Sequence, residues 1–75
     1  MKQEVFLRHM LKALTMRKAG DRPDYWMGYQ RGLRRRFHGE TFGTEEEHEV
    51  WMSSINSEDK QRQERGQGYR DGYNI

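Results

Sequence analysis

The sequence contains no cysteine, only one proline and no long apolar run. Without cysteine there are no disulfides, no thiolate zinc sites and no thiol nucleophiles. No apolar stretch approaches the ~20 residues that cross a bilayer, so we expect no membrane partner. Arg8, His9 and Lys12 interrupt any signal-peptide core. The absence of cysteine fits a reducing compartment, and we expect a cytoplasmic protein.

The strongly hydrophobic residues Val, Ile, Leu and Phe are also scarce. Val, Ile, Leu and Phe together make up 11 of the 75 residues, and the mean hydropathy is −1.32. A formal net charge of +2 is nevertheless too small for a typical disordered chain, and the aromatic residues and five methionines add apolar bulk. The length predicts one small domain, residues 1–75, which a partner or self-association as a homodimer would help to stabilise.

The charge divides the chain into a basic half, residues 1–38 with a net charge of +7, and an acidic half, residues 39–75 with a net charge of −5. This asymmetry indicates either an anionic partner for the basic half or mutual neutralisation of the halves within one fold.

Helical periodicity predicts an all-α fold, a small bundle of three to four short helices. In the segment 3–19, Phe6, Met10, Ala13 and Leu14 recur at helical spacing, with Leu7 and Leu11 beside them. Pro23 and Asp24 favour a second helix start, and this helix is expected to run to about His38.

The second helix combines an aromatic side with a basic side. At 100° per residue, Arg31, Arg34 and Arg35 fall opposite the arc that carries most of its apolar residues. That arc holds Tyr25, Trp26, Tyr29, Leu33 and Phe37. We therefore expect an aromatic core face and an exposed basic stripe.

The acidic half contains a capping signature and then a repeated motif. Thr44 and Glu47 match a capping box ahead of a third helix, on which His48, Trp51, Met52 and Ile55 form a stripe. Ser57 is expected to cap a polar fourth segment over residues 58–65.

The segment Gly68-Tyr69-Arg70-Asp71-Gly72 repeats the pattern of Gly28-Tyr29-Gln30-Arg31-Gly32. Helix propensity opposes a helix there, because each interior glycine costs about 1 kcal/mol. Paired glycines four residues apart nevertheless allow two helices to cross closely, and we expect that packing rather than a frayed tail.

Arginine-rich surfaces bind phosphate through bidentate hydrogen bonds. The candidate binding residues are Arg31, Arg34, Arg35, Arg36, Arg22 and Lys18. Such a surface binds nucleic acid without sequence specificity, but it also fits an acidic protein surface or internal pairing with the acidic half. The aromatic residues are expected in the core rather than stacked on bases.

We expect neither a metal site nor catalysis. Glu45 and His48 match half of a dimetal helix motif, but the remaining ligands are missing, and a capping glutamate with a half-buried histidine is the simpler interpretation. Ser53, Ser54 and Ser57 have no evident base, and a small-molecule pocket of ~300 Å³ is not expected in so short a chain. The protein is therefore predicted to be a non-enzyme without cofactors.

The doubled glycine-tyrosine segments, together with the central stretch ending in Trp51, resemble the ribosome modulation factor family of small proteins. The chain is also similar to small bacterial and phage proteins of unassigned role. The middle segment is longer and more acidic than in that family, the family's cysteine-proline turn is missing, and an additional helix precedes the motif. The resemblance implies a small basic protein that binds ribosomal RNA and silences ribosomes.

Two functions follow as expectations. The first is a non-enzymatic regulator that docks on a nucleic-acid-containing complex, such as a ribonucleoprotein, through the arginines of the second helix. The alternative is an inhibitor or adaptor of phage or mobile-element type that binds an acidic site on a host protein.

Overall fold

The computed structural model describes residues 1–75 and contains four α-helices and no strand, as expected for the all-α class. The helices are α1 (Gln3–Lys18), α2 (Pro23–His38), α3 (Glu45–Ser53) and α4 (Lys60–Tyr73). Two 3₁₀ turns, Gly39–Thr41 and Ser54–Asn56, lie on either side of α3. The fourth helix continues through the glycine-rich segment, so tertiary packing overrides the low helix propensity there.

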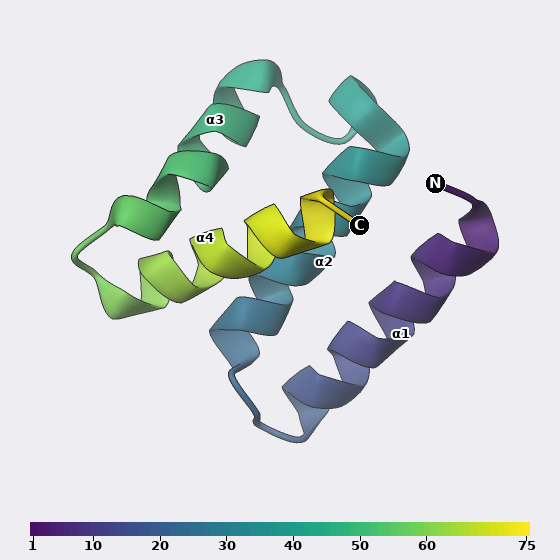
Figure 1. Cartoon of the computed structure of the whole chain (residues 1–75), viewed down its shortest axis with the longest axis horizontal. Helices are drawn as coiled ribbons and strands as arrows, with labels where there is room; N and C mark the ends of the chain where they lie inside the picture. The colour runs from purple at the N-terminus through teal and green to yellow at the C-terminus, as the bar shows by residue number, and fades with distance from the viewer.

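The helices form a flat assembly of 35 × 31 × 15 Å. In Figure 1 α4 crosses α2 at the centre, whereas α1 and α3 lie on opposite sides of this crossing. The helix α1 packs along α2, and α3 packs against α4. The pair α2 and α4 is therefore the framework that positions both outer helices.

The crossing depends on the two glycine pairs. A Cβ added at Gly28 or Gly32 would overlap the backbone carbonyls of Arg65 and Tyr69 in α4, respectively. Conversely, a Cβ at Gly68 or Gly72 would overlap carbonyls of α2. Glycine is required at these positions because any side chain would push the helices apart. The expected close packing of the repeated segments is confirmed.

The repeat extends to hydrogen bonds between the outer and the central helices. His9 Nδ1 of α1 lies 2.9 Å from the hydroxyl oxygen of Tyr29 in α2. In the second half His48 Nδ1 of α3 lies 2.7 Å from the hydroxyl oxygen of Tyr69 in α4. The unit α1–α2 and the unit α3–α4 are thus related by similar contacts, and they meet at the glycine crossing.

Local capping agrees with the sequence at one helix start and differs at another. The Thr44 side chain accepts a hydrogen bond from the Glu47 N–H at 3.1 Å, as predicted for α3. The cap of α4 is Asp59, which accepts from the Gln61 N–H at 3.0 Å. The predicted Ser57 cap is wrong, because the Ser57 hydroxyl accepts instead from the Asp59 N–H and supports the turn before the helix.

The hydrophobic core is small and lies mainly between α1 and α2. Ala13 and Leu33 are fully buried, and the rings of Phe6 and Phe37 stack at 4.4 Å between their centroids. Tyr69 is buried between α4 and α3 and stacks on the half-buried Trp51. The aromatic residues do supply the apolar bulk that the few aliphatic residues cannot.

One residue of the stripe expected in the core is exposed. Leu14, which the sequence placed with the inward residues of α1, is 40% exposed, and its neighbours Leu7 and Leu11 are 54% and 64% exposed. Only α2 covers α1, so one narrow side of this helix is buried while the leucines face away from the molecule.

Candidate binding surface

Two of the six predicted binding residues, both arginines, lie against other elements of the structure rather than on an open face. Arg35 is buried and pairs with Glu45, with 2.9 Å between Nη2 and the carboxylate oxygen. The Arg31 guanidinium lies over the rings of Phe42 and Trp51, at 5.3 and 4.9 Å from their centroids. The expectation that both point away from the core is wrong, because α3 and the turn before it cover this side of α2.

Not every polar atom of these two arginines has a hydrogen-bond partner. The Nε atoms of both Arg31 and Arg35 are buried without a hydrogen-bond partner. Cation–π contact with Trp51 and the ion pair with Glu45 offset part of the cost of burying these charges. Both side chains therefore act in holding the acidic half against α2.

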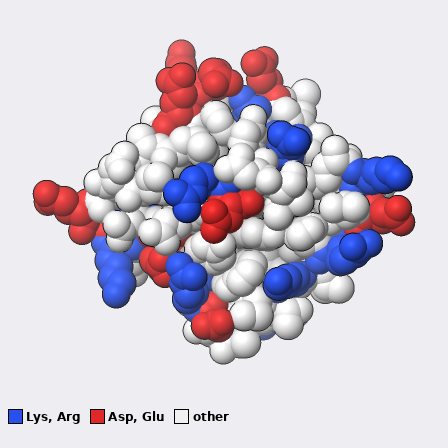
Figure 2. Space-filling view, in the orientation of Figure 1, with Lys and Arg blue, Asp and Glu red and all other residues white.

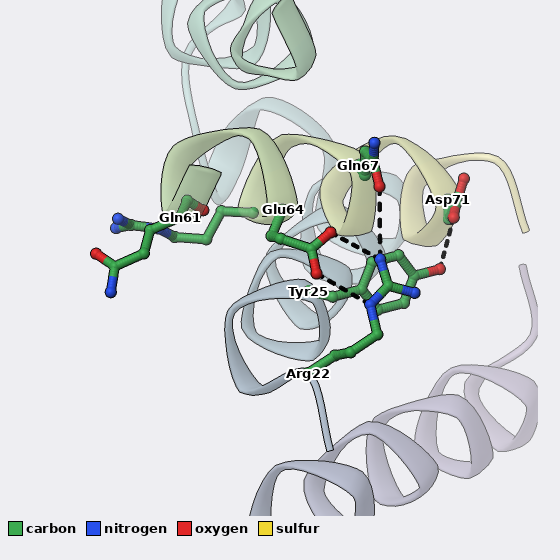
Figure 3. Close-up of polar contacts among 7 residues, drawn as sticks. Arg22, Tyr25, Gln61, Glu64, Gln67 and Asp71 are labelled. Carbon is green, nitrogen blue, oxygen red and sulfur yellow. Dashed lines mark hydrogen bonds and ion pairs between the residues drawn. The ribbon is translucent and has the colours of Figure 1, made fainter. Parts of the chain in front are cut away.

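Arg22 joins the two halves of the chain at the other end of α2. Its Nε and Nη2 atoms donate hydrogen bonds of 3.0 and 2.7 Å to the two carboxylate oxygens of Glu64 in α4 (Figure 3). The guanidinium also lies over the ring of Tyr25, at 4.2 Å from its centroid. Arg22 adopts a left-handed backbone conformation with φ of 49°, and its side chain reaches α4.

This pair shifts the pKa of both partners. The hydrogen bond from Arg22 lowers the pKa of Glu64 below its ordinary value, and the same bond raises the pKa of Arg22. Beside it, Tyr25 donates a hydrogen bond of 2.5 Å to Asp71 (Figure 3). Burial, followed by this hydrogen bond to a carboxylate, raises the pKa of the Tyr25 phenol.

The other three predicted residues remain on the surface. Lys18, Arg34 and Arg36 are exposed and form no ion pair with an acidic side chain. Arg36 lies over the ring of Tyr73 at 5.9 Å, on the α4 side of α2, whereas Arg34 is on a different side of the helix. The six predicted residues therefore divide into two groups. Arg22, Arg31 and Arg35 pair within the fold, although Arg22 is exposed, whereas Lys18, Arg34 and Arg36 form an external group.

Further exposed basic residues lie on α1. Arg8 and Lys12 are one helical turn apart, exposed and without an acidic partner, although Lys12 lies 5.8 Å from the ring centroid of Trp26. They are not among the predicted binding residues, because arginine is denser on α2. A helical projection of residues 3–18 places them beside the exposed leucines.

The acidic residues have a different distribution. Figure 2 shows acidic side chains gathered at one edge, whereas Lys and Arg are spread over the rest of this face and alternate with single acids. The exposed residues Glu45, Glu46 and Glu47 form the first turn of α3, where the positive end of the helix dipole favours carboxylates. The charge separation seen in the sequence is thus partly retained on the surface.

The histidines take part in packing contacts. His48 is half-buried against Tyr69, while Glu47 accepts from the Thr44 hydroxyl at 3.4 Å. No three histidine, aspartate or glutamate side chains lie close enough together to hold a metal ion.

A surface hollow of about 530 Å³ lies between the end of α3 and α4. It exceeds the volume that the sequence led us to expect. Its lining residues are Val50, Trp51, Ser53, Ser54, Asn56, Ser57, Arg62 and Arg65. The hydroxyls of Ser53 and Ser54 both donate to the Val50 carbonyl, and no histidine lines the hollow, so no nucleophile–base pair is formed there.

Comparison of the chain with protein-family models, with curated proteins and with solved structures found no match. None of the four helices combines the length and the apolar composition that crossing a membrane requires.

Proposed function

We propose that this chain is a non-enzymatic binding protein that docks on a nucleic-acid-containing complex in the cytoplasm. One observation carries this proposal: after the internal ion pairs are formed, the basic half keeps exposed cations without acidic partners. They include Arg8, Lys12, Lys18, Arg34 and Arg36. Such cations bind phosphates through counterion release and bidentate hydrogen bonds.

Three of the six residues predicted from the sequence are paired or covered within the fold. Arg22 and Arg35 are paired with Glu64 and Glu45, and Arg31 is covered by aromatic rings. The docking residues proposed here are therefore the external group, Lys18, Arg34 and Arg36, together with the basic residues of α1. The ribosome that the family resemblance implies is one such complex.

Nuclease-treated protein should bind purified ribosomes or a labelled structured RNA, measured by co-sedimentation and by fluorescence anisotropy. The triple variant Lys18→Glu/Arg34→Glu/Arg36→Glu should reduce affinity by at least tenfold and lower the slope of log K against log salt by about 2 to 3. The matched control is Arg62→Glu, an exposed arginine of the acidic half outside the proposed surface. Equal binding by the triple variant and the control would refute this surface.

A second candidate is an inhibitor or adaptor that binds an acidic protein surface. The mixed charges in Figure 2 favour it, because a small number of separated cations fits carboxylates on a protein as well as a continuous phosphate backbone. Capture of a partner from bacterial lysate with and without nuclease distinguishes the two. A partner retained after complete nuclease digestion would support the protein-binding function and contradict the nucleic-acid one.

A further inference from the structure

The outer face of α1 carries a regular apolar seam that nothing in the fold covers. Leu7, Leu11 and Leu14 are 54%, 64% and 40% exposed, although leucine side chains are usually buried. They are spaced by four and three residues, and Glu4 and Lys18 continue the same spacing at the two ends. Residues 4, 7, 11, 14 and 18 therefore occupy the a and d positions of a heptad.

Heptad spacing with leucine in the centre is the pattern of a helix that pairs with another helix. In Figure 1 α1 lies at the edge of the molecule, with α2 on one side and no element on the other. From this open face and from its charges we propose that α1 pairs with α1 of a second copy to form an antiparallel homodimer.

The charged residues at the two ends of the seam determine whether the paired helices run parallel or antiparallel. A two-fold axis next to Leu11 places Leu7 within one residue of the level of Leu14 of the second copy. It also places Glu4 opposite Lys18 of the second copy, at both ends of the seam. A parallel pair would instead place Glu4 against Glu4 and Lys18 against Lys18, which is repulsive. Charge complementarity therefore selects the antiparallel dimer.

The flanking positions are compatible with this register. Arg8 lies opposite Thr15 of the second copy, and Gln3 lies opposite Arg17. No flanking pair brings two like charges together. An acidic protein groove, the other occupant that an apolar and basic helix fits, offers no comparable role for Glu4.

The seam is short, since a helix of 16 residues is about 24 Å long, so we expect a weak dimer. Nuclease-treated protein should change from monomer to dimer in analytical ultracentrifugation between about 1 and 200 μM. Leu11→Glu should be monomeric throughout this range. Its circular dichroism and melting temperature, extrapolated to low concentration, should be unchanged because this side chain makes no core contact.

Variants that exchange the charges of Glu4 and Lys18 test whether the dimer is antiparallel. Glu4→Lys and Lys18→Glu should each weaken the dimer by about tenfold, because every antiparallel pair then contains like charges. The double variant Glu4→Lys/Lys18→Glu should recover wild-type dimerisation, whereas in a parallel dimer it would remain repulsive. The exposed control Lys2→Glu, outside the heptad positions, should have no effect.

Three results would overturn the inference. A chain that is monomeric at all concentrations leaves the leucine face to a different partner. Dimerisation that survives Leu11→Glu places the interface elsewhere. Failure of the double variant to recover excludes the antiparallel register. None of these results depends on nucleic-acid binding, which the ribosome and RNA assays measure separately.

Discussion

Gly32 of α2 lies directly against the backbone of Tyr69 in α4, so that a Cβ at Gly32 would overlap the Tyr69 carbonyl oxygen. The equivalent contact joins Gly72 to the Tyr29 carbonyl. These are contacts to backbone atoms, which no change of rotamer relieves. Carbonyl oxygens this close to glycine Cα–H groups also add weak hydrogen bonds to the crossing.

The first prediction concerns these glycines. Gly32→Ala and Gly72→Ala should each lower the melting temperature, because overpacking costs about 1–3 kcal/mol and exceeds the propensity gain of about 0.5–1 kcal/mol. The double variant should be non-additive, since both residues serve one interface. Gly43→Ala is the matched control, because its nearest neighbour would lie 3.8 Å away. Thermal unfolding followed by circular dichroism measures all four proteins, and a neutral Gly32→Ala would contradict the close crossing.

The second prediction concerns Arg22 and Glu64. Because the folded state lowers the pKa of Glu64, the pair stabilises the fold above the ordinary value of 4.5 and this contribution disappears as the pH falls through the lowered pKa. Glu64→Gln should cost about 0.5–1 kcal/mol at pH 7 and almost nothing near pH 2, as determined by urea unfolding. Glu49→Gln, at an exposed glutamate without an ion pair, should be neutral at both pH values. A pH-independent effect of Glu64→Gln would show that the charge of Glu64 is irrelevant.

The third prediction concerns the buried tyrosines. Burial raises the pKa of Tyr69 to about 12, and it also raises the pKa of Tyr25 and of Tyr29. A raised pKa means that stability is complete below the unfolded value of 10.0 and declines as the pH rises toward the folded value. Absorbance titration of the four tyrosines should therefore show most of them ionising above pH 10, together with loss of helicity. Ionisation of all four near pH 10 with intact helices would contradict their burial.

The fourth prediction separates two adjacent arginines. Arg34→Glu should change the free energy of unfolding by less than about 0.5 kcal/mol, because the side chain is exposed and unpaired. Arg35→Glu should destabilise by about 3 kcal/mol, because it buries an acid beside Glu45. Chemical denaturation of both variants tests this directly. Similar stability of the two would mean that Arg35 is not enclosed by the acidic half.

The sequence alone determined three of the four helices and the crossing. Hydrophobic periodicity, Pro23 and the Thr44 cap are local signals, and they placed three helices within about two residues of their observed ends. The spacing of the two glycine pairs predicted the contact between α2 and α4, because only glycine permits such an approach of two helices.

Only the tertiary structure decided which charged side chains lack a partner and which leucines are exposed to solvent. A helical projection gives the angle of each side chain but not the number of neighbours around the helix. Because α1, α4 and the α3 region surround α2, Arg35 became buried, whereas α1 touches a single helix and left Leu11 in solvent. The pairing of Arg22 with Glu64 spans 42 residues, and such distant partners are selected by how the helices pack, which no local pattern specifies.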